Sequence, residues 1–256
     1  MKKDTSTKRT KAAKGENVKN AVTKTNDTKK NDKKTAEVTE IVFILDRSGS
    51  MGGLENDTIG GYNSMLKKQK KEAGEAIVST ILFDDKIEVL HDRLPIKKID
   101  PITDDEYFVR GSTALLDAVG GAINHINGVH KKLEKDERPD KTLFIITTDG
   151  MENASSEYTY DKVKKLVEKQ KEKDHWEFIF LGANIDAVEV AGRFGVARNR
   201  AVRYECDSAG TALNFEVMSN MVSCARKCKD AGTMQEAFDC DELLAPIQAD
   251  YRMRHK

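Results

Sequence analysis

Residues 41–50 read Ile-Val-Phe-Ile-Leu-Asp-Arg-Ser-Gly-Ser: five apolar residues in a row, then an aspartate and two serines. An unbroken apolar run bounded by Asp46 and Gly49 is typical of a strand that is buried on both faces. Such strands lie in the middle of parallel sheets, where helices cover both faces. Gly49 has no Cβ and lets the chain turn tightly between Ser48 and Ser50. This segment therefore predicts a central strand that ends in a polar loop.

Downstream of this strand, short apolar runs alternate with helical patterns. The region after Thr113 has apolar residues at spacings of three and four, which predicts a long helix. The expected strands are 41–45, 77–83, 86–91, 142–148, 176–181 and 201–204, and the other expected helices are 57–72, 160–173, 185–194 and one around 215–225. This alternation predicts an α/β fold with a doubly wound, mainly parallel central sheet and helices on both faces. Segment 86–91 begins soon after Phe83 and predicts one antiparallel edge strand through a hairpin.

The charge is unevenly distributed along the 256 residues, although the formal net charge is zero. Residues 1–36 contain 12 Lys and Arg against 4 Asp and Glu, and the remainder contains 31 against 39. Segment 1–37 has almost nothing to bury, which predicts a disordered basic tail. A solubilising role is favoured for it, and nucleic-acid binding is unlikely except through this tail. We expect one α/β domain over 38–229 and a C-terminal extension over 230–256, partly helical or disordered, with 250–256 unstructured.

Targeting signals and cysteines bear on the cellular compartment. The Lys-rich N-terminus is not followed by an apolar signal region, and no apolar run approaches the roughly 18 residues that span a bilayer. The cysteines lie in the last quarter, outside the expected core: Cys206, Cys224, Cys228 and Cys240. They lack the paired C-x-x-C spacing of common zinc sites, so reduced thiols are favoured over a four-thiolate zinc site. We therefore expect a cytoplasmic protein without a membrane segment.

Polar residues gather in three loops that we expect at one edge of the sheet. Asp46, Ser48 and Ser50 follow the first strand, Thr113 stands at the start of the long helix, and Asp149 follows strand 142–148. Ligands on parallel sheets bind beyond the carboxyl ends of the strands, where these loops meet. Two carboxylates and three hydroxyls suit a hard cation such as Mg²⁺, which prefers oxygen ligands and tends to keep several waters. Such a site retains positive charge and an open position for an incoming carboxylate.

The order and context of these residues resemble the metal-ion-dependent adhesion site (MIDAS) of the von Willebrand factor A (vWA) domain family. The resemblance covers roughly residues 38–205, and Leu181-Gly182-Ala183-Asn184 onward is similar to a subgroup of small bacterial members. It implies that Ser48, Ser50 and Thr113 coordinate the metal directly. Asp46 and Asp149 would act largely through water, and a partner's Asp or Glu would complete the shell. Ligand types alone do not distinguish Mg²⁺ from Mn²⁺ or Ca²⁺.

These features favour a metal-dependent protein–protein interaction module rather than an enzyme. One alternative is a hydrolase or phosphotransferase that uses the same ion, but the three loops contain no His or Cys. Phosphotransfer on Asp46 would normally need a second Asp where Ser48 stands, and phosphate-binding Gly-rich loops are absent. Another alternative is a scaffold with a purely structural metal. Each Asp, Ser or Thr taken singly also suits a turn or a helix N-cap. The partner and the oligomeric state stay open.

Overall fold

Six strands form the central sheet, in the order β3-β2-β1-β4-β5-β6. A computed structural model of the protein describes residues 37–240 and 242–256. The strands are β1 (Val38–Asp46), β2 (Glu75–Phe83), β3 (Ile87–Pro95), β4 (Lys141–Thr148), β5 (Glu177–Gly182) and β6 (Ala201–Arg203). All neighbouring pairs are parallel except β2 and β3, which are antiparallel. The predicted fold class is therefore confirmed, including the antiparallel edge strand.

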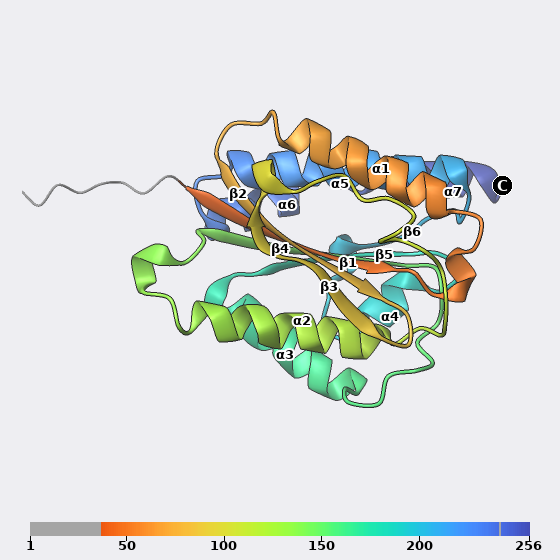
Figure 1. The fold of residues 1–256 in the computed structure, drawn as a ribbon, viewed down its shortest axis with the longest axis horizontal. Helices are drawn as coiled ribbons and strands as arrows, with labels where there is room; N and C mark the ends of the chain where they lie inside the picture. Colours follow the sequence, from red (N-terminus) through yellow and green to blue (C-terminus); the bar gives the residue numbers. More distant parts are fainter. Residues whose placement is uncertain (1–36, 241) are drawn as a thin grey trace, which may run out of the picture. The chain divides into compact units, whose positions relative to one another are not determined.

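Helices cover both faces of this sheet (Figure 1). One face carries α1 (Glu55–Gln69), α5 (Ser208–Lys227), α6 (Ala231–Cys240) and α7 (Ala245–Arg254), and the other carries α2 (Leu115–His130), α3 (Tyr160–Asp174) and α4 (Ala187–Arg193). Short 3-10 helices occur at Gly49–Met51, Ile96–Lys98, Lys135–Glu137 and Arg198–Arg200.

The side chains of β1 alternate between two hydrophobic clusters. Ile41, Phe43 and Leu45 belong to the cluster that contains residues of α1 and α5. Val42 and Ile44 belong to the cluster that contains residues of α2 and α3. Successive strand residues point to opposite faces, so an uninterrupted apolar run serves both clusters. This explains why β1 lies at the centre of the sheet and brings Asp46 to its carboxyl edge.

The C-terminal extension is more ordered than expected. We expected 250–256 to be unstructured, but residues 250–254 belong to α7. Ile247 anchors this helix in the core, and Arg254 pairs with Asp250 one turn earlier at 3.0 Å and with Asp207 at 2.5 Å. The long-range contacts of Ile247 and of Arg254 with Asp207 stabilise a segment whose own apolar content is low. The predicted disordered tail 1–37 lies, apart from Glu37, outside the described residues. Each helix within the described ranges is too short or too polar to cross a membrane.

Two adjacent glycines of α1 give a matched test of how this helix packs on α5. A Cβ on Gly61 would lie 2.2 Å from a ring carbon of Phe215 and 3.0 Å from its Cβ, whereas one on Gly60 meets nothing within 4 Å. We expect Gly61→Ala to lower the free energy of unfolding by about 1–3 kcal/mol, because the helices must separate. Gly60→Ala should raise it by up to about 1 kcal/mol through helix propensity. Urea denaturation measures both, and equal effects would contradict this packing.

Candidate metal centre

The three loops that hold the predicted site residues converge at the carboxyl edge of the sheet. β1 and β4 are parallel neighbours with Leu45 opposite Thr147, so Asp46 and Asp149 follow strands that end side by side. The first loop is joined to the second by a hydrogen bond from the Gly49 amide to the Gly111 carbonyl at 3.2 Å. The Asn153 amide donates to the Thr113 carbonyl at 3.0 Å and joins the second loop to the third. Sheet order thus brings together residues that are about a hundred positions apart in sequence.

The structure brings all five predicted residues together. Ser48 Oγ lies 3.1 Å from both Ser50 Oγ and Thr113 Oγ1. Ser50 Oγ donates to Asp149 Oδ1 at 2.5 Å. Asp46 accepts hydrogen bonds from the Ser48 amide at 2.7 Å and from Thr148 Oγ1 at 2.5 Å, which fix the orientation of its carboxylate. The result is a continuous group of hydroxyl and carboxylate oxygens.

The hydroxyls in this group do not cap helices. The N-cap residues of α1 and α2 are Leu54 and Ala114, whose side chains form no capping bond. The first-turn amides of Leu116 and Asp117 in α2 donate instead to Glu152 and Ser155. Ser48 flanks the 3-10 helix at Gly49–Met51 without a capping bond. The interpretation of Ser50 and Thr113 as ordinary caps is therefore not supported by their contacts. Both hydroxyls instead lie 3.1 Å from Ser48 Oγ, and that of Ser50 also donates to Asp149.

The two carboxylates of the site lack a cationic side chain. Asp46 and Asp149 are each 1% exposed, and neither forms an ion pair with a Lys, Arg or His of the described residues. Burial raises the pKa of Asp46 to about 6, against the opposing effect of its hydrogen bonds from Ser48 and Thr148. Buried charges in proteins are normally paired or bound to metal. The site therefore has the electrostatics of a cation site and the oxygen donors that a hard cation prefers.

Gly150 leaves open the space beside the hydroxyls. A Cβ at this position would lie 3.0 Å from Ser50 Oγ, 3.1 Å from Thr113 Oγ1 and 3.9 Å from Ser48 Oγ. The absence of a side chain thus provides room next to all three hydroxyls, and the residues present fit a small cation.

We expect Gly150→Ala to weaken divalent-metal binding by roughly tenfold or more, because the methyl group enters the space beside the ligand oxygens. The fold should change little, since the contacts made by the methyl group are with side-chain hydroxyls at a surface loop. Titration of the variant with Mn²⁺ measures the effect. Gly60→Ala is the matched control, because its Cβ meets nothing within 4 Å. Wild-type affinity in Gly150→Ala would contradict this placement of the metal.

Sequence reasoning missed a buried ion-pair network behind the first loop. Arg47 is fully buried, and its Nε lies 2.9 Å from Asp84 Oδ2, while Arg110 Nε lies 2.8 Å from the same oxygen. Arg47 also pairs with Glu88 at 2.7 Å. Asp84 lies in the turn between β2 and β3, where its Oδ1 accepts from the Lys86 amide at 2.8 Å, but it is also buried and joins the loops that carry Ser48 and Thr113. A buried turn acid and an exposed one look the same in sequence, so no local signal distinguishes them.

Two more residues hold the site and were not singled out from the sequence. The buried Tyr107 hydroxyl donates to the Asp46 carbonyl at 2.5 Å and fixes the end of β1. The Cys206 thiol donates to Asp149 Oδ2 at 3.3 Å. Burial, together with the charge of Asp149, raises the pKa of Cys206 to about 12, so this thiol stays protonated.

Other metal-binding arrangements are not formed in the part of the chain that the structure describes. No group of three or more His, Cys, Asp or Glu there is arranged to hold a metal ion. The four-thiolate zinc site considered from the sequence is thus not formed. A metal at the sheet edge would depend on hydroxyl ligands as well as on the two carboxylates.

Comparison with known proteins identifies the fold. No family model matches the chain, and no curated protein matches it. Among solved structures, the chain is similar to a von Willebrand factor type A protein from Catenulispora acidiphila, with 13% identity, a TM-score of 0.51 and coverage of 73% of this chain and 43% of that one. The six-stranded sheet, with its antiparallel edge strand and two helical layers, is thus a vWA-like fold.

Two further structures share this fold. The pilus adhesin SpaC from Lactobacillus rhamnosus GG is 10% identical, with a TM-score of 0.55 over 74% of this chain and 30% of that one. Proximal thread matrix protein 1 from the mussel byssus, in a form with a zinc-occupied MIDAS motif, is 15% identical. Its TM-score is 0.50, over 73% of this chain and 46% of that one. The chain thus spans less than half the length of these relatives, and identities this low establish the fold alone.

Proposed function

We propose that this protein is a metal-dependent protein-interaction module that binds an acidic residue of a partner protein. The observation that carries the proposal is the pair of buried carboxylates, Asp46 and Asp149, which have no cationic partner among the described residues and adjoin three hydroxyls. Such an arrangement suits Mg²⁺, or Mn²⁺ or Ca²⁺ in its place. Proteins with this fold include an adhesin and a matrix protein with a zinc-occupied MIDAS motif, which supports the proposal.

The hydroxyl and carboxylate residues would have different roles at such a site. The hydroxyls of Ser48, Ser50 and Thr113 would hold the ion, and the carboxylates of Asp46 and Asp149 would balance part of its charge, largely through water. When bound, the ion supplies a Lewis-acidic position that attracts a carboxylate oxygen. Because three of the protein donors are neutral, the ion keeps net positive charge toward the partner.

The surroundings favour binding over catalysis. Hydrolysis or phosphoryl transfer needs a general base or nucleophile near the ion. The three loops contain no histidine and no cysteine. Among the described residues, Asp46 and Asp149 are the carboxylates that contact Ser48 and Ser50, and both are assigned to the metal.

Isothermal titration of the full chain with Mn²⁺ and Mg²⁺ tests the proposal. We expect one binding site, and a loss of affinity of roughly tenfold or more in Ser50→Ala, because one ligand oxygen is removed. Ser112→Ala is the matched control: it lies in a site loop, is exposed and makes no side-chain hydrogen bond within the described residues. A peptide with a single glutamate should then bind more tightly with Mn²⁺ than in EDTA, and Ser50→Ala should remove this increase. Metal binding that Ser50→Ala leaves intact, or peptide affinity that is the same with Mn²⁺ and in EDTA, would contradict the proposal.

A further inference from the structure

A groove runs along the free edge of the sheet, away from the site residues described above. It has a volume of about 550 Å³ and is lined by β6, the 3-10 helix before it, Val188 of α4, and Gln248, Tyr251 and Arg252 of α7. Ala201 and Val202 give it an apolar floor. Because β6 is the last strand of the sheet, no strand of the described residues pairs with its outer edge.

The charged residues that line this groove all have the same sign. Arg198, Arg203 and Arg252 line it, and no Asp or Glu of the described residues does. None of the three forms a salt bridge within those residues: Arg203 stacks on Tyr251 at 4.9 Å, and Arg252 donates to the Gln248 amide oxygen at 3.4 Å. Guanidinium groups without a carboxylate partner are well suited to bind carboxylates in bidentate geometry.

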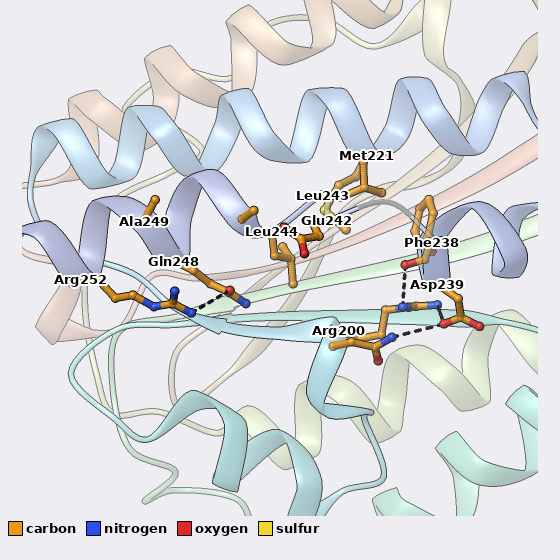
Figure 2. A pocket seen from close by; sticks show the side chains of 12 residues that line it. Arg200, Met221, Phe238, Asp239, Glu242, Leu243, Leu244, Gln248, Ala249 and Arg252 are labelled. Carbon is orange, nitrogen blue, oxygen red and sulfur yellow. Dashed lines mark hydrogen bonds and ion pairs between the residues drawn. The ribbon is translucent and has the colours of Figure 1, made fainter.

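Two carboxylates near the groove, Asp239 and Asp207, are already paired with other arginines. In the adjoining pocket shown in Figure 2, Arg200 is bound by Asp239 at 2.7 Å and by the Phe238 carbonyl at 2.9 Å. Arg252 and Gln248 line both pockets. Beyond β6, Asp207 pairs with Arg254. The adjoining pocket thus has carboxylates in its lining, Asp239 and the exposed Glu242, whereas the groove along β6 has none among the described residues.

We propose that this groove binds an extended acidic segment of a partner protein. The guanidinium groups of Arg198, Arg203 and Arg252 receive the acidic side chains. The half-buried Val188 and Tyr251 contact the apolar side chains of the segment. The basic segment 1–36 of this chain has the wrong charge to occupy the groove. The site differs from the proposed metal centre because it binds acidic residues without a metal ion.

The test uses the full chain in EDTA and a fluorescent, capped hexapeptide of alternating glutamate and valine. Fluorescence anisotropy should show binding that weakens with added NaCl. Arg198→Ala should weaken it by about tenfold, as expected for loss of a charge-assisted hydrogen bond. The matched control is Arg138→Ala, which removes the same charge from an exposed residue outside the groove. Ser50→Ala should bind the peptide as the wild type does, so failure here is distinguishable from failure of the metal proposal.

Two further probes separate recognition of an acidic peptide from other modes of binding. The same hexapeptide with glutamine in place of glutamate keeps its length and backbone but loses its charges, and we expect it to bind at least about tenfold more weakly. Equal binding of the glutamine peptide would overturn the role given to the three arginines. Binding of inorganic triphosphate without binding of the peptide would identify a phosphate site and overturn the proposal. Peptide binding that Arg198→Ala and Arg138→Ala reduce equally would overturn the assignment to this groove.

Discussion

Asp46→Asn is expected to abolish metal binding and, at the same time, to stabilise the metal-free protein at neutral pH. The substitution removes a buried negative charge that has no cationic partner among the described residues. The amide keeps the oxygen that accepts from the Ser48 N–H, and Thr148 retains an alternative acceptor in the Gly150 carbonyl at 3.3 Å. We expect a gain of roughly 1–3 kcal/mol in the free energy of unfolding in EDTA at pH 7.5.

The pH dependence of this gain follows from the pKa of Asp46. It is about 6 in the folded protein against 3.8 as the ordinary value, so the folded state binds the proton more tightly. In the wild type, the preference of the folded state for protonated Asp46 contributes fully to stability below pH 3.8, and this contribution is lost as the pH rises through 6. The difference in the free energy of unfolding between Asp46→Asn and the wild type should therefore decrease as the pH falls from 7.5 to 5.

Chemical denaturation at the two pH values, with and without Mn²⁺, measures both effects. Metal at a hundred times its dissociation constant should stabilise the wild type by about 2.7 kcal/mol and leave Asp46→Asn unchanged. Asp105→Asn, an exposed change of the same chemistry, is the control. Two results would contradict the role of the Asp46 carboxylate in binding a cation. One is an Asp46→Asn variant that is less stable than the wild type in EDTA, and the other is a variant that Mn²⁺ still stabilises.

The second large effect is expected from Asp84→Ala. This buried carboxylate binds Arg47 and Arg110 and also accepts from the Lys86 amide at 2.8 Å. Burial tends to raise its pKa, but the hydrogen bonds from Arg110, Lys86 and Arg47 outweigh burial and hold the pKa below its usual value. Removing it leaves the fully buried Arg47 guanidinium with only Glu88, half exposed, as a charged partner. Breaking a buried pair in this way typically costs about 3–5 kcal/mol.

Urea denaturation and Mn²⁺ titration of Asp84→Ala separate folding from site geometry. Arg110 also donates its backbone amide to the Arg47 carbonyl at 2.9 Å, so the loops bearing Ser48 and Thr113 should shift. We expect metal affinity to fall by about tenfold even where the variant is fully folded. Asp104→Ala is the matched control, since it removes an exposed turn acid and should change stability by less than about 0.5 kcal/mol. A loss below about 1 kcal/mol in Asp84→Ala would contradict the role given to this network.

The sequence by itself determined the strands of the sheet, the helices as far as α5, the fold class and which residues gather at the sheet edge. The apolar run 41–45 and the helical spacing around Leu116 are local properties, readable without any distant partner. Boundaries differed by a few residues: the helix expected over 57–72 is Glu55–Gln69. The convergence of Asp46 and Asp149 also followed from the sequence, because parallel strands place their carboxyl ends at the same edge.

Only the tertiary structure decided what surrounds those residues. The pairing of Arg47 with Asp84 joins positions 37 residues apart, and that of Arg254 with Asp207 joins positions 47 apart. The burial of Asp84, the contact of Cys206 with Asp149 and the ordering of residues 250–254 have the same origin. The physical reason is that apolar periodicity reports which face of its own element a residue occupies. The burial and partner of a charged side chain instead depend on which distant element packs against it.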